Sequence, residues 1–398
     1  MKFARNLSIF IQIFTKKSKL LSNWALLRRR KMTEKRSTKP LVAFFGGLNE
    51  NLPEFKEFTK TFDVVFYELV SREQFVSDLK TKLHNIEAIY GAWAPLGKIG
   101  NLDKELVAKL PSSLKLITVC SAGFGGLDLE ALRERGIKFC NSPTYGAPAV
   151  AETVLYHVLN GFRKFGLFEA TLRQNPHTIE ARSLLGNVKN FDAESGVFVL
   201  DHSKKSKYCF GHHVGTIDVH SPVGKTATIV GFGAIGKEVG TRLSSLGMNI
   251  IYIKRNKLSL EEEAQLGYKV RYAARIHDVA AESDCIVLCL PATPQSINMI
   301  NKDVIQLMKK GVILVNVGRG SLINDKDMIQ GLKDGHIGFV GLDVFPEEPL
   351  VHHCERQDMS LTPHVGSATS ENFDQTAIFC LRNITQYLLH GKIENLQN

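Results

Sequence analysis

Residues 226–255 read TATIVGFGAIGKEVGTRLSSLGMNIIYIKR, and this stretch decides the fold. An apolar run ends in a glycine-rich turn, a helical pattern follows, and a second apolar run covers 250–253. Strand, turn, helix and strand within about 30 residues are typical of a dinucleotide-binding unit. The first glycine permits the turn, the second lets a pyrophosphate approach the backbone, and the third lets the helix pack on the strand. We expect these residues to contact the dinucleotide: Gly231, Gly233, Ala234, Ile235 and Gly236.

The end of the second strand indicates which dinucleotide binds. An NAD enzyme places Asp or Glu there to accept hydrogen bonds from the ribose hydroxyls, whereas this chain has Lys254 and Arg255. Two cations pair with a 2'-phosphate instead, through charge-assisted hydrogen bonds. The sequence therefore predicts NADP(H) as the preferred cofactor, with NAD(H) possible. The alternative is that both residues are ordinary solvated charges at a strand end.

Two α/β segments are predicted from apolar runs that alternate with helical patterns. The first spans 41–141 and has the strand-like runs LVAFFGG, DVVFYEL, IEAIYGAW, LKLITVC and IKFCN. The second begins at Lys225 and has six: TATIVGFG, NIIYIK, YKVRYA, DCIVLCL, VILVNVG and IGFVGLDVF. Near-continuous apolar strands separated by helices predict parallel sheets covered on both faces. Between the two, a long apolar helix from about Ala149 is followed by an irregular excursion, 186–222, for which a hairpin is one alternative.

The positive charge is concentrated in the leader. The chain has 398 residues and a net charge of +10, yet residues 1–39 contain twelve Lys or Arg and a single acid, Glu34. The rest is close to neutral, which argues against a nucleic-acid protein. Its apolar runs are strand-length, too short to span a membrane. The leader is basic and amphipathic, as in a mitochondrial transit peptide. A plain tail, or a start at Met32 in a cytoplasmic protein, are the alternatives.

The cysteines and histidines predict neither disulfides nor a metal site. Seven cysteines are odd in number and scattered along the chain, which is typical of a reducing compartment. The pairs His212-His213 and His352-His353 are interpreted as loop histidines.

Three polar residues follow successive strand ends in the second segment. Arg319 follows VILVNVG, Glu348 follows GLDVF, and His364 follows the short run SLTP. Ligands of such sheets bind beyond the carboxyl ends of the strands. A guanidinium can hold a carboxylate through two hydrogen bonds, an imidazole can donate a proton to a developing alkoxide, and a carboxylate can orient that imidazole. Together they suit the reduction of a 2-oxo acid.

From about Leu41 to the C-terminus the chain resembles the D-isomer-specific 2-hydroxyacid dehydrogenases. The motifs that carry this resemblance are LKLITVCSAGFGGLDLEALRERGIKFCNSP, GKTATIVGFGAIGK, LPATPQSINMI, NVGRGSLIND, GLDVFPEEP and LTPHVGSAT. The resemblance implies that Arg319 binds substrate, that His364 is the acid/base, and that Glu348 is its acidic partner. It places Asp343 near the nicotinamide amide. It also implies substrate contacts at Ala122 and Gly123 and cofactor contacts at Pro291 and Val317.

The resemblance further implies the architecture. A Rossmann cofactor domain, 152–363, is expected to be inserted into a flavodoxin-like substrate domain made of 40–151 and 364–398, and homodimers are usual. The segment KRNKL is similar to the NADPH-preferring glyoxylate and hydroxypyruvate reductase branch. We therefore expect a reductase that gives a D-2-hydroxy acid. Two alternatives stay open: a dinucleotide-regulated, corepressor-like scaffold of the same fold, and an NAD-dependent 2-hydroxy acid dehydrogenase.

Overall fold

The computed structural model describes residues 38–93, 97–143, 145–200 and 209–398. Nearly all of the basic leader lies outside these ranges, so its role in targeting stays a prediction. Within them, no helix combines the length and the apolar character that crossing a membrane requires.

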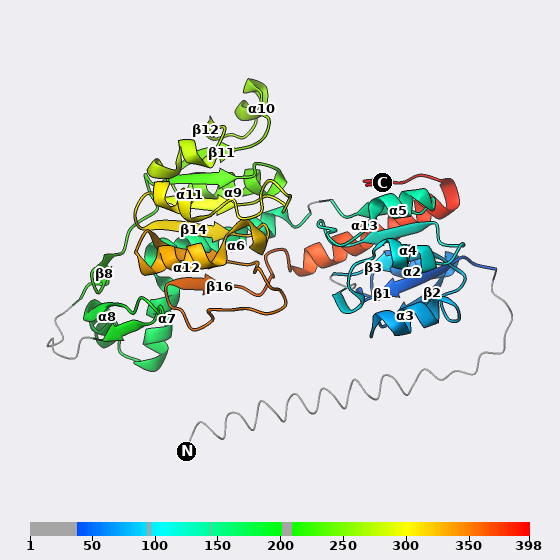
Figure 1. The fold of residues 1–398 in the computed structure, drawn as a ribbon, viewed down its shortest axis with the longest axis horizontal. Coiled ribbons are helices and arrows are strands. Elements are labelled where there is room, and N and C mark those ends of the chain that lie inside the picture. The colour runs from blue at the N-terminus through cyan, green and yellow to red at the C-terminus, as the bar shows by residue number, and fades with distance from the viewer. Residues whose placement is uncertain (1–37, 94–96, 144, 201–208) are drawn as a thin grey trace, which may run out of the picture.

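The first unit is a five-stranded parallel sheet with helices on both faces (Figure 1). The strand order β2-β1-β3-β4-β5 is that of flavodoxin-like folds. All five strands coincide with the apolar runs from which they are predicted. The elements are β1 Leu41–Phe45, α2 Pro53–Thr61, β2 Asp63–Tyr67, α3 Arg72–Leu79, β3 Ile86–Gly91, the short 3-10 helix η1 Gly97–Ile99, α4 Lys104–Lys109, β4 Leu116–Val119, α5 Leu129–Glu134 and β5 Lys138–Asn141.

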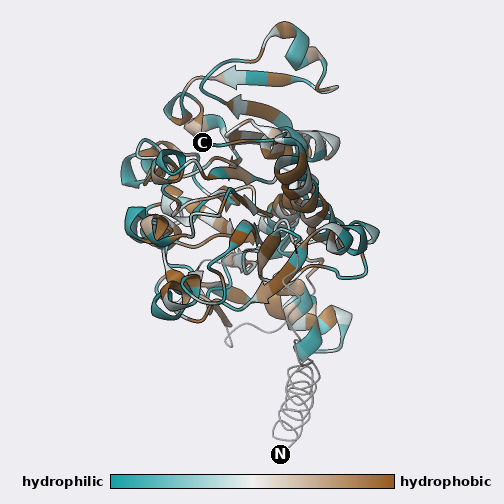
Figure 2. Cartoon of the chain, turned by 90° about the vertical axis from the view of Figure 1, so that its right-hand side faces the viewer, coloured by the Kyte–Doolittle hydropathy of each residue, from teal (hydrophilic) through white to brown (hydrophobic). Residues whose placement is uncertain are grey.

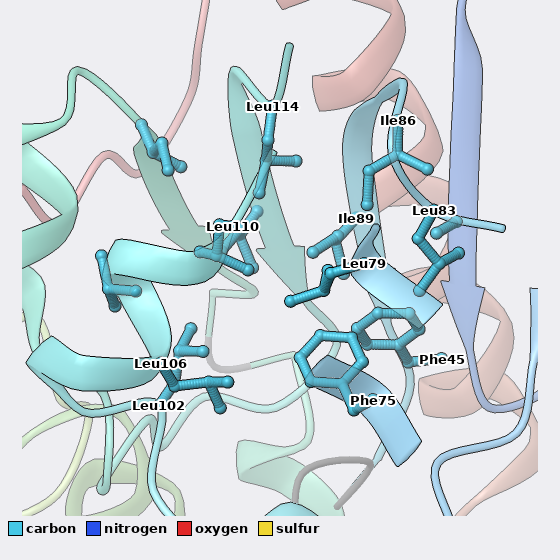
Figure 3. Close-up of a cluster of buried hydrophobic side chains, with 14 of the residues drawn as sticks. Phe45, Phe75, Leu79, Leu83, Ile86, Ile89, Leu102, Leu106, Leu110 and Leu114 are labelled. Atoms are coloured by element: carbon cyan, nitrogen blue, oxygen red, sulfur yellow. The ribbon is translucent and has the colours of Figure 1, made fainter. Parts of the chain in front are cut away.

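Each face of this sheet buries its own apolar core. On one face Phe45 packs edge-on against Phe75 of α3, beside leucines of α3 and α4 (Figure 3). The other face is covered by α2 and by the last helix of the chain, α13 Ser370–His390, so that Phe44 and Phe379 belong to one cluster. Residues 395–398 then hydrogen-bond along β5. The C-terminal segment thus completes a unit begun more than 200 residues earlier.

The second unit is a seven-stranded parallel sheet of order β12-β11-β10-β13-β14-β15-β16. Its first six strands have the 3-2-1-4-5-6 order of a Rossmann domain. The elements are β10 Thr226–Val230, α9 Ala234–Ser245, β11 Asn249–Ile253, α10 Leu260–Ala264, β12 Val270–Ala273, η2 Ile276–Asp278, η3 Ala280–Glu282, β13 Cys285–Leu288, α11 Lys302–Leu307, β14 Val312–Asn316, η4 Gly320–Leu322, α12 Asp325–Lys333, β15 Ile337–Leu342 and β16 Met359–Leu361.

The sheet has a seventh strand, β16, whereas the sequence predicts six. It has only three residues, and its centre is polar, because Ser360 hydrogen-bonds to a buried histidine, His157. A short strand with a polar centre lacks the apolar run from which the other six are predicted.

The long helix α6, Ala147–Arg163, covers the larger sheet and packs mainly against α9, β14 and β15. In Figure 2 the hydrophobic colour follows the strands and the inner sides of the helices, and the outer sides are mostly hydrophilic.

After α6 two helices, α7 Phe165–Gln174 and α8 Thr178–Gly186, lead to the excursion at 186–222. Two antiparallel pairs follow, β6 Val188–Phe191 with β7 Phe198–Leu200 and β8 His213–Val214 with β9 Ile217–Asp218. The predicted fold, a Rossmann domain inserted into a flavodoxin-like domain, is confirmed.

Candidate active site

The glycine turn between β10 and α9 leaves an open cradle at the start of the helix. Gly231 has a φ of 93°, and a side chain there would meet the carbonyl oxygen of Cys289 at 2.8 Å. A side chain at Gly233 would instead point into open space. Gly233 caps α9 without any side-chain hydrogen bond, so the first amides of the helix are available to an anion. The turn therefore fits a pyrophosphate.

The end of β11 presents two cations. Lys254 is half-buried and Arg255 is exposed, and neither forms an ion pair with any residue that the structure describes. No Asp or Glu lies between the end of β11 and α10. These residues fit a cofactor that has an additional phosphate on the adenine ribose.

His364 and Glu348 form a hydrogen-bonded pair. His364 Nδ1 lies 2.8 Å from Glu348 Oε2, and Glu348 Oε1 accepts a hydrogen bond of 2.9 Å from the backbone N–H of Phe345. The carboxylate is thus held by the backbone, and it orients the imidazole. Nε2 of His364 has no partner among the described residues, and half of the side chain is exposed. This nitrogen is therefore available to exchange a proton with a ligand.

Arg319 lies against the loop after β4 of the other unit. A Cβ added at Gly123 would overlap the guanidinium of Arg319, so the backbone of this loop and the cation are in close contact. The backbone N–H groups of Ser121, Ala122 and Gly123 donate to no group in the described part of the chain. A guanidinium beside free amides is an arrangement that binds a carboxylate.

The turn that presents Arg319 is fixed by Asn316. The side chain of Asn316, at the end of β14, donates to the carbonyl of Arg319 at 2.8 Å and accepts from the N–H of Gly318 at 3.0 Å. A side chain at Gly320 would collide with the backbone of Phe345. The Arg319 backbone is thereby held against the segment that leads to Glu348.

The two remaining predicted cofactor residues follow neighbouring strands. Pro291 lies after β13 and is exposed, and Val317 follows β14 and is buried. Both lie at the edge of the sheet that has the glycine turn. Their contacts with the cofactor stay predictions.

Asp343 has partners that the sequence does not indicate. Its buried carboxylate accepts hydrogen bonds from Thr362 Oγ1 at 2.7 Å and from the N–H groups of Val365 and Gly366, each at 2.9 Å. His364 lies between these residues and has a φ of 54°. Asp343 thus fixes the loop that presents the imidazole, while its predicted contact with the nicotinamide amide stays a prediction.

Comparison with known proteins identifies the family. The model "D-isomer specific 2-hydroxyacid dehydrogenase, NAD binding domain" matches residues 200–366. A provisionally named 2-hydroxyacid dehydrogenase of Saccharomyces cerevisiae is 31% identical over 369 residues, covering 87% of this chain and 93% of the relative. The chain belongs to the D-isomer-specific 2-hydroxyacid dehydrogenase family. This dehydrogenase is also 28% identical to glyoxylate reductase 1 of S. cerevisiae, over 90% of this chain and 94% of that protein.

Solved structures agree with the fold of this dehydrogenase. The holo form of Rhodotorula graminis D-mandelate dehydrogenase superposes with a TM-score of 0.78 at 28% identity, covering 90% of this chain and 98% of that one. The chain is therefore an oxidoreductase of the 2-hydroxyacid dehydrogenase type with a Rossmann domain that binds a nicotinamide dinucleotide.

Beneath the His364 loop, the dehydrogenase contains a buried histidine that sequence reasoning missed. His157 of α6 is fully buried; its Nδ1 lies 2.6 Å from Ser360 Oγ and its Nε2 lies 3.2 Å from Thr362 Oγ1. Thr362 in turn donates to Asp343. In the sequence His157 is simply one position on an apolar helix. Gly341 of β15, where a side chain would meet the histidine at 2.5 Å, is the one local signal of its close packing.

Burial lowers the pKa of His157 to about 4. The unfolded chain, with a histidine pKa near 6.5, therefore binds more protons than the folded one between about pH 4 and 6.5. We expect the free energy of unfolding to fall as the pH drops through this window, by up to about 3 kcal/mol from this residue. Denaturant unfolding at several pH values measures this.

The variant His157→Gln should show a flatter pH dependence than the native protein. His277→Gln, at an exposed histidine, is the matched control and should keep the native slope. Equal slopes for His157→Gln and the native protein would contradict the assignment.

Proposed function

We propose that the protein is an NADPH-preferring reductase of small 2-oxo acids, glyoxylate or hydroxypyruvate being the expected acceptors, and that it produces the D-2-hydroxy acid. The observation that carries the proposal is the pair Glu348 and His364 on the sheet edge that has Arg319 and the glycine turn. Nε2 of this histidine has no partner among the residues described in 38–93, 97–143, 145–200 and 209–398. The 28% identity to glyoxylate reductase 1 of S. cerevisiae supports the choice of acceptor. A homodimer, expected from the family, stays a prediction.

The site residues perform two tasks in the reaction: they bind the substrate carboxylate and they donate a proton. Arg319 and the amides of Ala122 and Gly123 hold the substrate carboxylate and orient the adjacent carbonyl. His364, protonated and held by Glu348, donates the Nε2 proton to the carbonyl oxygen as negative charge develops there. The bound nicotinamide supplies the hydride. After transfer His364 is neutral, and it recovers a proton from solvent through its exposed side.

The first test is turnover of the full chain with NADPH or NADH and a series of 2-oxo acids, from glyoxylate and hydroxypyruvate to larger branched acids. We expect NADPH oxidation with the small acids. In His364→Ala, kcat should fall by about 100-fold or more, the usual scale for general acid catalysis. NADPH binding, followed by its fluorescence, should be unchanged in that variant. Native turnover in His364→Ala would remove the histidine from the mechanism. Tight NADPH binding without reduction of any acid would refute the reductase.

Neutralising Lys254 and Arg255 together should weaken NADPH by about 10-fold or more and leave NADH nearly unchanged. Only NADPH has the phosphate that these cations would contact, and such bonds contribute about 1.5–3 kcal/mol each when well formed. The matched control neutralises Lys269 and Lys310, exposed lysines that precede β12 and β14 at the opposite edge of the sheet. Equal losses for NADPH and NADH would contradict the predicted cofactor preference.

Gly123→Ala should raise KM for the 2-oxo acid about 10-fold while leaving the stability of the fold nearly unchanged. The added methyl group displaces the Arg319 guanidinium, and tenfold corresponds to about 1.4 kcal/mol, part of one charge-assisted hydrogen bond. Gly125→Ala is the control, because a methyl group there meets nothing within 4 Å. A similar KM in both variants would separate Gly123 from the carboxylate site.

A further inference from the structure

The excursion brings one cysteine and two histidines together. Cys209, His212 and His213 each offer a ligand atom, and these atoms lie within 4.8 Å of one another. Cys209 is buried, His213 is half-buried and His212 is exposed. They are the one group of three or more potential metal ligands found in the described ranges. The sequence predicts loop histidines here, because it does not show that the chain turns back on Cys209.

We propose that Cys209, His212 and His213 bind a zinc ion. The distance between Cys209 Sγ and His213 Nε2 is 3.7 Å. Zinc bonds of about 2.3 Å to sulfur and 2.0–2.1 Å to nitrogen at a tetrahedral angle place these atoms roughly 3.6 Å apart. Two of the three ligands are therefore already spaced for a shared ion. The exposed His212 ring completes the set by turning about its side-chain torsions.

Neighbouring backbone groups orient Cys209 and His213 as they would be oriented to bind a metal. His213 Nδ1 lies 3.0 Å from the carbonyl oxygen of Gly215, which fixes Nδ1 as the protonated nitrogen and leaves the Nε2 lone pair facing the sulfur. The backbone N–H of Gly211 donates to Cys209 Sγ at 3.3 Å, a contact that holds the sulfur in place. Imidazole and thiolate together are the ligand types typical of zinc.

The site rests on a packed support. Gly215 N–H donates to the carbonyl of Leu185 at 2.9 Å, which ties the β8–β9 turn to the end of α8. A side chain at Gly186 would meet Cys209 Sγ at 2.8 Å, so Cys209 lies directly on that helix end. Leu185 and Val214 are buried in one small apolar cluster. A zinc ion here joins the hairpin to α8, and a water molecule takes the fourth position.

Cobalt provides the direct test, because a tetrahedral thiolate complex of Co²⁺ has an intense sulfur-to-metal charge-transfer band. We expect the metal-stripped full chain to develop this band on adding Co²⁺, and Zn²⁺ to displace it. Cys209→Ser should abolish the band. His212→Gln, at an exposed position that the fold tolerates, should weaken Zn²⁺ by about 100-fold or more, since the loss of even an outer partner costs about 10–100-fold.

The chain offers a matched control of the same residue types. His352, His353 and Cys354 are adjacent in sequence, but the two rings contact Glu347 and Asp325 instead of the thiol. Replacing all three should leave the band and the Zn²⁺ affinity unchanged. Any one of four results would overturn the proposal. The band is absent in the native protein, the band persists in Cys209→Ser, the Zn²⁺ affinity is unchanged in His212→Gln, or the band is lost in the control.

Discussion

The parallel pairing of β10, β13, β14, β15 and β16 is the constraint on which the site depends. Because every strand runs the same way, the residues that follow each strand gather at one edge of the sheet. This edge holds groups from different parts of the sequence: the glycine turn, Arg319, Glu348 and His364. The common direction of the strands is what brings them together. A change in the direction of any one strand would send its polar residue to the opposite edge.

Burial determines which of the polar groups near this edge are structural. The carboxylate of Asp343 is buried and saturated by Thr362 and two backbone amides, and His157 beneath it is buried and hydrogen-bonded to two hydroxyls. Removing either would leave polar partners unsatisfied in the interior. His364 is half exposed, and its Nε2 has no partner in the part of the chain that the structure describes. The buried, hydrogen-bonded residues below therefore fix the position of the His364 imidazole. Its exposed side can still exchange protons.

Much of this could be predicted because apolar runs and glycine spacing are local signals. Eleven of the twelve strands in the two large sheets follow from them, as does the order of Arg319, Glu348 and His364. The contact of Gly123 with Arg319 depends on how two separate units meet, and no local pattern encodes it. The contact between His157 and Ser360 could not be predicted for a related reason. His157 is a single polar residue on an apolar helix, and Ser360 lies on a strand of only three residues. The role of each becomes visible only when the fold places the imidazole beside the hydroxyl.

The position of α13 has a consequence for biosynthesis. The sheet face formed by Val42, Phe44 and Tyr90 is covered partly by Phe379 and Ile384, which belong to the last helix. That helix follows every strand of the Rossmann unit in the sequence, so it is synthesised after all of them. An apolar surface of the N-terminal unit therefore lacks this cover until the chain beyond the Rossmann strands has been made. The N-terminal unit is thus begun before the Rossmann unit and completed after it.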